Sequence, residues 1–124
     1  MSETSIQFEN IISQCRELFS KKLQDYGPAW RVLRPSSITD QIYIKVNRIR
    51  TLQMTGKKMV DESEEDEFVA IINYSIIALI QLEKGFSNDF NENKEEILKL
   101  YDHYAAEARQ LMERKNHDYG EAWR

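Results

Sequence analysis

Apolar residues recur at steps of three and four positions in four segments of this chain, and no segment alternates steadily between apolar and polar residues. Such spacing is typical of helices that bury one face. It predicts helices over about residues 4–24, 37–54 and 91–116, with another that opens in the acidic cluster "DESEEDE" and ends at residue 84. We therefore predict an all-α, four-helix bundle-like fold.

The residues at the predicted helix boundaries support these limits. Gly27 supplies a C-terminal break after the first helix, and Pro28 prevents its continuation. Ser37 and Asp40 have the spacing of a capping box, which predicts the start of the second helix. The third helix is apolar nearly all round, so we expect it to be the central and most buried one.

The chain ends in "KNHDYGEAWR", which repeats the earlier "KLQDYGPAWR". Nine of sixteen positions are identical between residues 16–31 and 109–124, so the fourth predicted helix repeats the first. We read residues 1–88 as a first copy of three helices and residues 89–124 as the start of a second, truncated copy. Two interpretations stay open: a piece of a longer protein with tandem copies, or a fourth helix that completes a bundle.

Composition and charge narrow the class of protein. Between residues 16 and 58 ten Lys/Arg face three Asp/Glu, whereas from residue 59 onward seven face sixteen. This asymmetry predicts either a basic, ligand-facing surface or two halves that complement each other. Cys15 is the only cysteine, so it forms no internal disulfide; we expect it to be buried, in a cytoplasmic protein. The most apolar stretch, about residues 68–82, is short for a membrane span, and we expect no membrane association.

Lys45 stands out in the second predicted helix because it falls inside the apolar stripe, with Arg48 at its border. The stripe consists of Ile38, Ile42, Val46, Ile49 and Leu52. A lysine that faces inward has three outcomes: it extends its ammonium to water, pairs with a carboxylate, or meets an anionic ligand.

An acidic cluster opens the third predicted helix. Glu62 shares one helical face with Glu65 and with Asp66, and such carboxylates can hold Mg²⁺ together with water. The alternative is helix capping, since Ser63 and Asp66 have the spacing of a capping box and acidic residues stabilise a helix N-terminus. Asn73 lies farther along this helix among isoleucines, so it needs a buried hydrogen-bond partner.

The segment "DYGPAWR" combines a carboxylate, two aromatic rings and a guanidinium around a glycine turn. Tyr26 or Trp30 could stack on a base while Arg31 holds a phosphate, with Asp25 beside them. The alternative is a turn that ends the helix, with its aromatic side chains filling the end of the bundle.

Three segments, "KxxDYGxAWR", "SSITDQIYIKVNRIR" and "EEDEFVAIINYSIIALIQLE", together resemble the nucleotide-modification-associated domain family. The resemblance covers about residues 16–84 as one copy and residues 109–124 as the start of another. That family is in turn similar to the all-α, MazG-type NTP pyrophosphohydrolases, which are oligomeric and Mg²⁺-dependent. The resemblance therefore implies a MazG-like fold, a nucleotide ligand and a homo-oligomer.

The motif residues of that family fall on definite positions of this chain. They are Asp25, Tyr26 and Gly27, Lys45 and Arg48 on the second helix, and Glu65, Asp66, Asn73 and Tyr74 on the third. The pattern departs from the MazG-type enzymes, which carry Glu-x-x-Glu on one helix and Glu-x-x-Asp on a later one. Only Glu62 and Glu65 fit that arrangement here, so the resemblance leaves hydrolysis open.

The sequence thus predicts a nucleotide-binding helical domain without direct DNA binding. If it is an enzyme, we expect an Mg²⁺-dependent pyrophosphohydrolase in which Glu62, Glu65 and Asp66 hold the metal, which activates a water. Its other expected ligand-binding residues are Asp25, Tyr26, Trp30, Arg31, Lys45, Arg48 and Asn73. The alternative is a non-catalytic helical module for interaction or oligomerisation.

Overall fold

The computed structural model describes residues 2–56, 63–89 and 91–120. Four α-helices and one short 3₁₀-helix follow one another in the order α1 (Glu3–Tyr26), η1 (Ala29–Val32), α2 (Pro35–Thr55), α3 (Glu64–Lys84) and α4 (Lys94–Tyr119). The described residues contain no strand, which confirms the all-α prediction.

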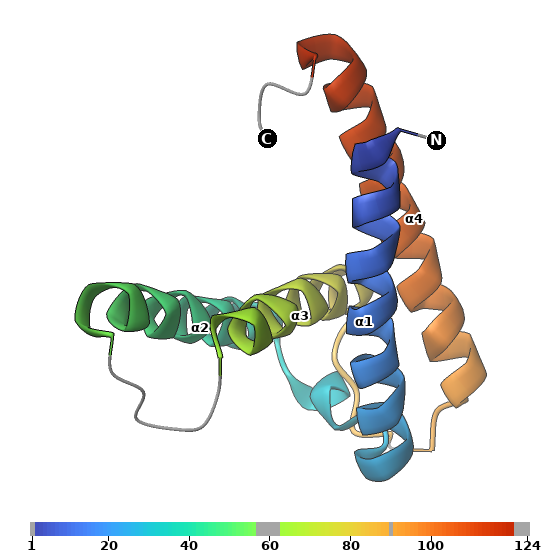
Figure 1. Ribbon diagram of the computed structural model, residues 1–124. Helices are drawn as coiled ribbons and strands as arrows, with labels where there is room; N and C mark the ends of the chain where they lie inside the picture. The colour runs from blue at the N-terminus through green and yellow to red at the C-terminus, as the bar shows by residue number, and fades with distance from the viewer. Residues whose placement is uncertain (1, 57–62, 90, 121–124) are drawn as a thin grey trace.

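The helices form two pairs. α1 and α4 lie side by side and antiparallel, as Figure 1 shows, and Lys94 Nζ at the start of α4 lies 3.5 Å from the carbonyl of Gln24 at the end of α1. α2 and α3 lie side by side and run across the α1–α4 pair (Figure 1). α3 contacts the other three α-helices, so the prediction that it is central is confirmed.

The helix boundaries are set by local residues. Gly27 ends α1 with a positive φ of 65°, and its N–H donates to the carbonyl of Leu23 at 2.9 Å, as the break at this glycine predicted. α2 begins at Pro35 with no side-chain cap, so the predicted capping box of Ser37 and Asp40 is wrong. Proline suits the first helical position because it has no N–H to satisfy and its φ is already fixed, and the helix therefore starts two residues earlier.

The core lies where the two pairs cross. It is made of Phe19 and Leu23 from α1, Ile38 from α2, Ile76, Ile77 and Ile80 from α3, and Ile97, Tyr101 and Ala105 from α4. The faces of α2 and α3 differ from those predicted: Val46 is exposed, and so are Phe68, Leu79 and Leu82. The described residues leave these four side chains uncovered, and none of the helices described is long and apolar enough to cross a bilayer.

Candidate functional site

A cavity of about 620 Å³ lies between α1, η1, α2 and α3, and we call it the α3 cavity. Leu18, Leu23, Ala70 and Ile77 belong to its apolar wall. Its polar residues are Lys22, Tyr26, Lys45, Asp66, Glu67, Asn73 and Tyr74. Ligand sites commonly have this size and this composition, with a few polar groups placed in an apolar wall.

Glu67, in the first turns of α3, holds the negative charge at the centre of this site. Its side chain is only 2% exposed, and Lys45 Nζ lies 3.9 Å from Oε2 while Arg48 Nη1 lies 3.8 Å from Oε1. A carboxylate this deep needs positive partners, because the loss of water otherwise costs several kcal/mol. Both distances are those of ion pairs and exceed the usual hydrogen-bond length of about 2.7–3.2 Å.

Lys45 faces inward, as its place in the apolar stripe predicted. Its side chain is 17% exposed, lines the α3 cavity and meets a carboxylate. The carboxylate is Glu67, which was not among the predicted site residues. Helical spacing carries the information that was missed: steps of three and four back from Ile77 through Ala70 lead to Glu67.

Asn73 supplies hydrogen bonds from the wall of the cavity to the interior. Its Nδ2 donates to the carbonyl of Cys15 on α1 at 3.0 Å, and the hydroxyl of Tyr101 on α4 donates to its Oδ1 at 2.7 Å. The predicted need for a buried partner is therefore met. Burial raises the pKa of Tyr101 above its ordinary value, so the phenol remains a donor at neutral pH.

The acidic start of α3 is capped as predicted. Ser63 Oγ accepts from the N–H of Asp66 and Asp66 Oδ2 accepts from the N–H of Ser63, both at 3.2 Å. Asp66 also lines the α3 cavity, whereas Glu65 is exposed and does not. Glu62 lies outside the described residues, among which no group of three His, Cys, Asp or Glu is placed to hold a metal ion.

The aromatic residues of "DYGPAWR" reach the same cavity from two positions. Trp30, on η1, packs against Phe19 with ring centroids 5.9 Å apart and lines the wall. Tyr26 lies at the rim and is largely exposed, while Asp25 is exposed and does not line the cavity.

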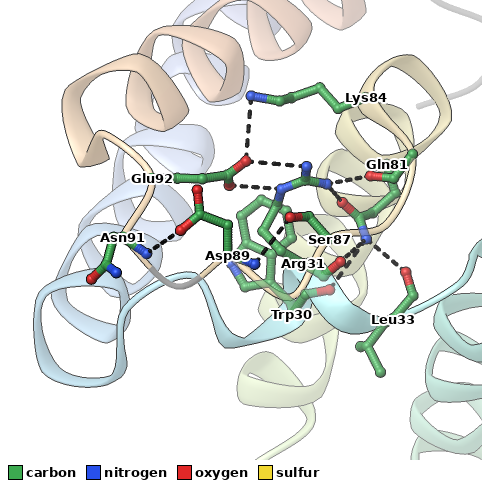
Figure 2. A network of polar contacts seen from close by, with 10 residues as sticks. Trp30, Arg31, Leu33, Gln81, Lys84, Ser87, Asp89, Asn91 and Glu92 are labelled. Atoms are coloured by element: carbon green, nitrogen blue, oxygen red, sulfur yellow. Dashed lines mark hydrogen bonds and ion pairs between the residues drawn. The ribbon is translucent and has the colours of Figure 1, made fainter.

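Arg31 lies elsewhere, in a buried network that joins η1 to the end of α3 (Figure 2). Its side chain is 3% exposed, and Nε and Nη2 donate to the two carboxylate oxygens of Glu92 at 2.7 and 3.2 Å. Nη1 donates to Gln81 Oε1 and to the carbonyl of Gly85. Gln81 Nε2 in turn donates to the carbonyls of Arg31 and Leu33, at 2.9 and 2.6 Å.

The predicted ligand residues are thus brought together only in part. Tyr26, Trp30, Lys45, Asp66 and Asn73 line one cavity, and Arg48 reaches it through Glu67. Arg31 does not, because its guanidinium is already hydrogen-bonded on both edges. Glu92 and Gln81, which hold it, were not predicted as partners.

The fold and the cavity define an all-helical protein with a lysine–glutamate pair in the wall of one pocket. Residues 22–82 match the model of the family described as Nucleotide modification associated domain 1. This segment runs from the end of α1 to the end of α3 and contains Lys45, Glu67 and Asn73. No match is found among curated proteins or among solved structures.

Proposed function

We propose that the α3 cavity binds a nucleoside phosphate. The observation that carries the proposal is the inward-facing ammonium of Lys45, which lines a cavity large enough for a nucleotide. An ammonium so placed offers three donors to an anion. The description of the matching family, which concerns nucleotide modification, supports the choice of ligand.

The end of the cavity that would hold the phosphate is assigned from the charged residues around Lys45. Among the described residues of the cavity lining, the cations are Lys22 and Lys45 and the carboxylates are Asp66 and Glu67. The two carboxylates oppose these two ammonium groups and the Arg48 guanidinium beside Glu67, which leaves too little positive charge for a phosphate group that carries about two negative charges. We therefore include Mg²⁺ in the proposal, bound between the phosphate oxygens and a carboxylate.

The described residues fit such a metal only in company with the phosphate. Mg²⁺ commonly takes one or two carboxylates, several waters and phosphate oxygens, so a group of three protein ligands is not required. Asp66 lines the cavity and would be the first ligand, with Glu62 and Glu65 as its neighbours in sequence. The metal would neutralise charge on the phosphates. The proposal stops at binding, because one carboxylate in the lining beside a lysine-paired Glu67 defines no hydrolytic site.

The base end is assigned to the aromatic wall. Trp30 forms part of the lining beside Phe19, and Tyr26 stands at the rim where a base could enter. Stacking of a base on such rings contributes on the order of 1–3 kcal/mol and tolerates different bases. The proposal is accordingly for a class of ligand, a nucleoside phosphate, with the base left to experiment.

The experiment is a set of thermal melts with nucleoside mono-, di- and triphosphates, each with and without Mg²⁺. Stabilisation by about 2.7 kcal/mol is expected at a hundredfold excess over Kd, and more with Mg²⁺ than without. Lys45→Met should remove the shift. Arg50→Met, an exposed substitution on the same helix, should retain it. Unchanged melting of the folded protein with every nucleotide at millimolar concentration would contradict the proposal.

A second candidate function, a non-catalytic interaction module, is favoured by a different observation. The α2–α3 pair leaves Tyr43, Phe68 and Leu82 at least half exposed. Exposed apolar side chains that gather on one element commonly mark a surface for another protein. A concentration-dependent mass in sedimentation that Leu82→Asp abolishes would support this function, and a monomer at all concentrations would exclude homo-oligomerisation through this surface.

A further inference from the structure

The α1–α4 pair carries two reciprocal ion pairs. Arg16 on α1 meets Asp102 on α4, with Nε 2.6 Å from Oδ1, and Arg109 on α4 meets Glu9 on α1, with Nη1 2.5 Å from Oε1. Arg109 follows Arg16 by 93 positions, and Asp102 follows Glu9 by the same 93. Each repeat therefore donates one arginine and one carboxylate to the other.

Such reciprocity is the property of a twofold arrangement, in which residue i contacts j and j contacts i. The surface of the pair shows the same relation a second time. A shallow hollow on α1 is lined in part by Glu17, Ser20, Lys21 and Gln24, and a hollow on α4 is lined by the four residues that lie 93 positions later. A local twofold axis between the antiparallel α1 and α4 (Figure 1) relates both sets.

The rest of the molecule does not obey this axis. On α1, Cys15, Phe19 and Leu23 follow one another at steps of four, and all three are buried. The α3 cavity and α3 itself lie against this stretch of α1. The counterparts of these three residues on α4 are Ala108, which is exposed, and Met112 and Asn116, which are half-buried. The difference has a simple cause: the α2–α3 pair covers α1 and not the matching half of α4.

Residues of the cavity wall are repeated on the exposed half of α4. Leu18, Lys22 and Tyr26 line the α3 cavity. Leu111, Lys115 and Tyr119 stand 93 positions later, with identical side chains. The second half of α4 thus presents these three side chains in the same helical order as the half of α1 that the α2–α3 pair covers.

We propose that residues 108–119 of α4, together with the first half of α1, form a docking surface for a second helix pair of the α2–α3 type. The occupant is a second copy of residues 35–84, placed by the same axis that relates the ion pairs. The surface is continuous with the α1–α4 interface, and Phe8 stands where the axis places the counterpart of the core residue Tyr101. Docking would enclose a second cavity, to whose wall Leu111, Lys115 and Tyr119 would contribute as Leu18, Lys22 and Tyr26 do to the first.

The experiment is a fusion of the full chain to a second copy of its residues 32–88, attached after Arg124. Hydrogen exchange should show the amides of the added helices protected at least about tenfold over the same amides in a fusion that carries Ala108→Arg. Ala108 is exposed without the added pair, so this change blocks docking and leaves the original fold intact. Gln110→Arg, on the exposed hollow of α4, is the matched control and should retain the protection.

Equal exchange of the added helices in the fusion and in its Ala108→Arg variant would overturn the proposal. Met112→Asp offers an independent check, since it places a carboxylate where the axis puts Phe19, and it should remove the protection as well. Protection of the first α2–α3 pair, measured in the same spectra, reports whether each variant is folded. The readout uses no nucleotide, so it stands or fails apart from the proposed function.

Discussion

The two ends of α3 each hold a buried charged group, and they hold it in different ways. Near the first turn, Glu67 faces Lys45 and Arg48 at the wall of the α3 cavity. At the last turn, Gln81 Oε1 accepts a hydrogen bond from Arg31, which also forms an ion pair with Glu92. Both groups are at least 97% buried, so the cost of removing water from them is similar and cannot explain the difference.

At the last turn the charge is held by short, directed hydrogen bonds. Arg31 donates to Glu92 through two nitrogens, and this bidentate geometry is among the strongest that side chains form. Gln81 is equally engaged, with its oxygen accepting from Arg31 and its nitrogen donating to backbone carbonyls (Figure 2). These hydrogen bonds fix η1 to the end of α3.

At the first turn the ion pairs of Glu67 with Lys45 and Arg48 are longer than hydrogen bonds, and a cavity lies beside them. The side chain of Lys45 is 17% exposed and lines the cavity, so its ammonium is accessible to a ligand that enters there. The comparison teaches that burial of a charge does not by itself mark a functional site. The geometry of its partners and the space beside it distinguish a candidate binding site from a structural network.

The largest loss of stability is expected at the last turn of α3, where Arg31 is fully hydrogen-bonded. Arg31→Met should lower the free energy of unfolding by about 3–5 kcal/mol, because it removes the bidentate partner of the half-buried Glu92 and leaves the buried Gln81 Oε1 without its donor. Urea denaturation measures the loss. Arg50→Met, on the exposed side of α2, should cost less than about 0.5 kcal/mol. A loss at Arg31 no larger than at Arg50 would mean that the network does not stabilise the fold.

The corresponding change at the other end should cost less. Lys45→Met is expected to lower the free energy of unfolding by about 1–2 kcal/mol, because Arg48 still faces Glu67 after the substitution. The same urea experiment applies. If Lys45→Met costs as much as Arg31→Met, the two ends are equally rigid and the distinction between them fails.

Next in size is the hydrogen bond that links the cavity wall to α4. Tyr101→Phe removes the donor to Asn73 Oδ1 and should cost about 1–2 kcal/mol at neutral pH. The variant also tests a pH dependence. Burial raises the pKa of Tyr101 above 10.0, so the folded protein holds the phenolic proton more tightly than the unfolded chain does.

The stabilising contribution of this proton is complete below pH 10 and falls as pH rises further. The wild type should therefore lose its advantage over Tyr101→Phe progressively above pH 10. Tyr104, whose pKa the Glu83 hydrogen bond raises to about 12, affects both proteins alike, whereas the buried thiol of Cys15 adds to the rise in the pKa of Tyr101. A constant difference through alkaline pH would show that Tyr101 titrates normally.

Local features of the fold could be predicted from the sequence. The break at Gly27, the end of the third helix at residue 84 and the capping box of Ser63 with Asp66 depend on residues within a few positions of each other. The inward direction of Lys45 also follows from helical periodicity alone. These features depend on local sequence and can be predicted without knowing how the helices pack.

The partners of the buried charges could not be predicted in the same way. Arg31 and Glu92 are 61 positions apart, and their pairing depends on where the loop after α3 crosses η1. Glu67 was assigned to no site because the acidic cluster offered several carboxylates, and only the packing of α2 on α3 selects one. The packing of α2 on α3 also decides the exposure of Val46, because Lys45 and not Val46 lies on the face of α2 that lines the cavity.

The smallest predicted effect concerns the cap that positions the cavity end of α3. Ser63→Ala should lower the free energy of unfolding by about 1 kcal/mol, because the N–H of Asp66 loses its acceptor. Ser37→Ala, at the capping box that the structure does not form, should be within about 0.5 kcal/mol of the wild type. Urea denaturation compares the two.

The same pair of variants connects the cap to the cavity. Ser63→Ala removes the acceptor of the Asp66 N–H and keeps the Ser63 N–H that donates to Asp66 Oδ2, so it loosens the first turn of α3 that positions Asp66 at the lining. If Asp66 binds Mg²⁺ with a nucleotide, the Mg²⁺-dependent part of the melting shift should change in Ser63→Ala and not in Ser37→Ala. An identical Mg²⁺ dependence in both would place the metal, if it binds, away from Asp66.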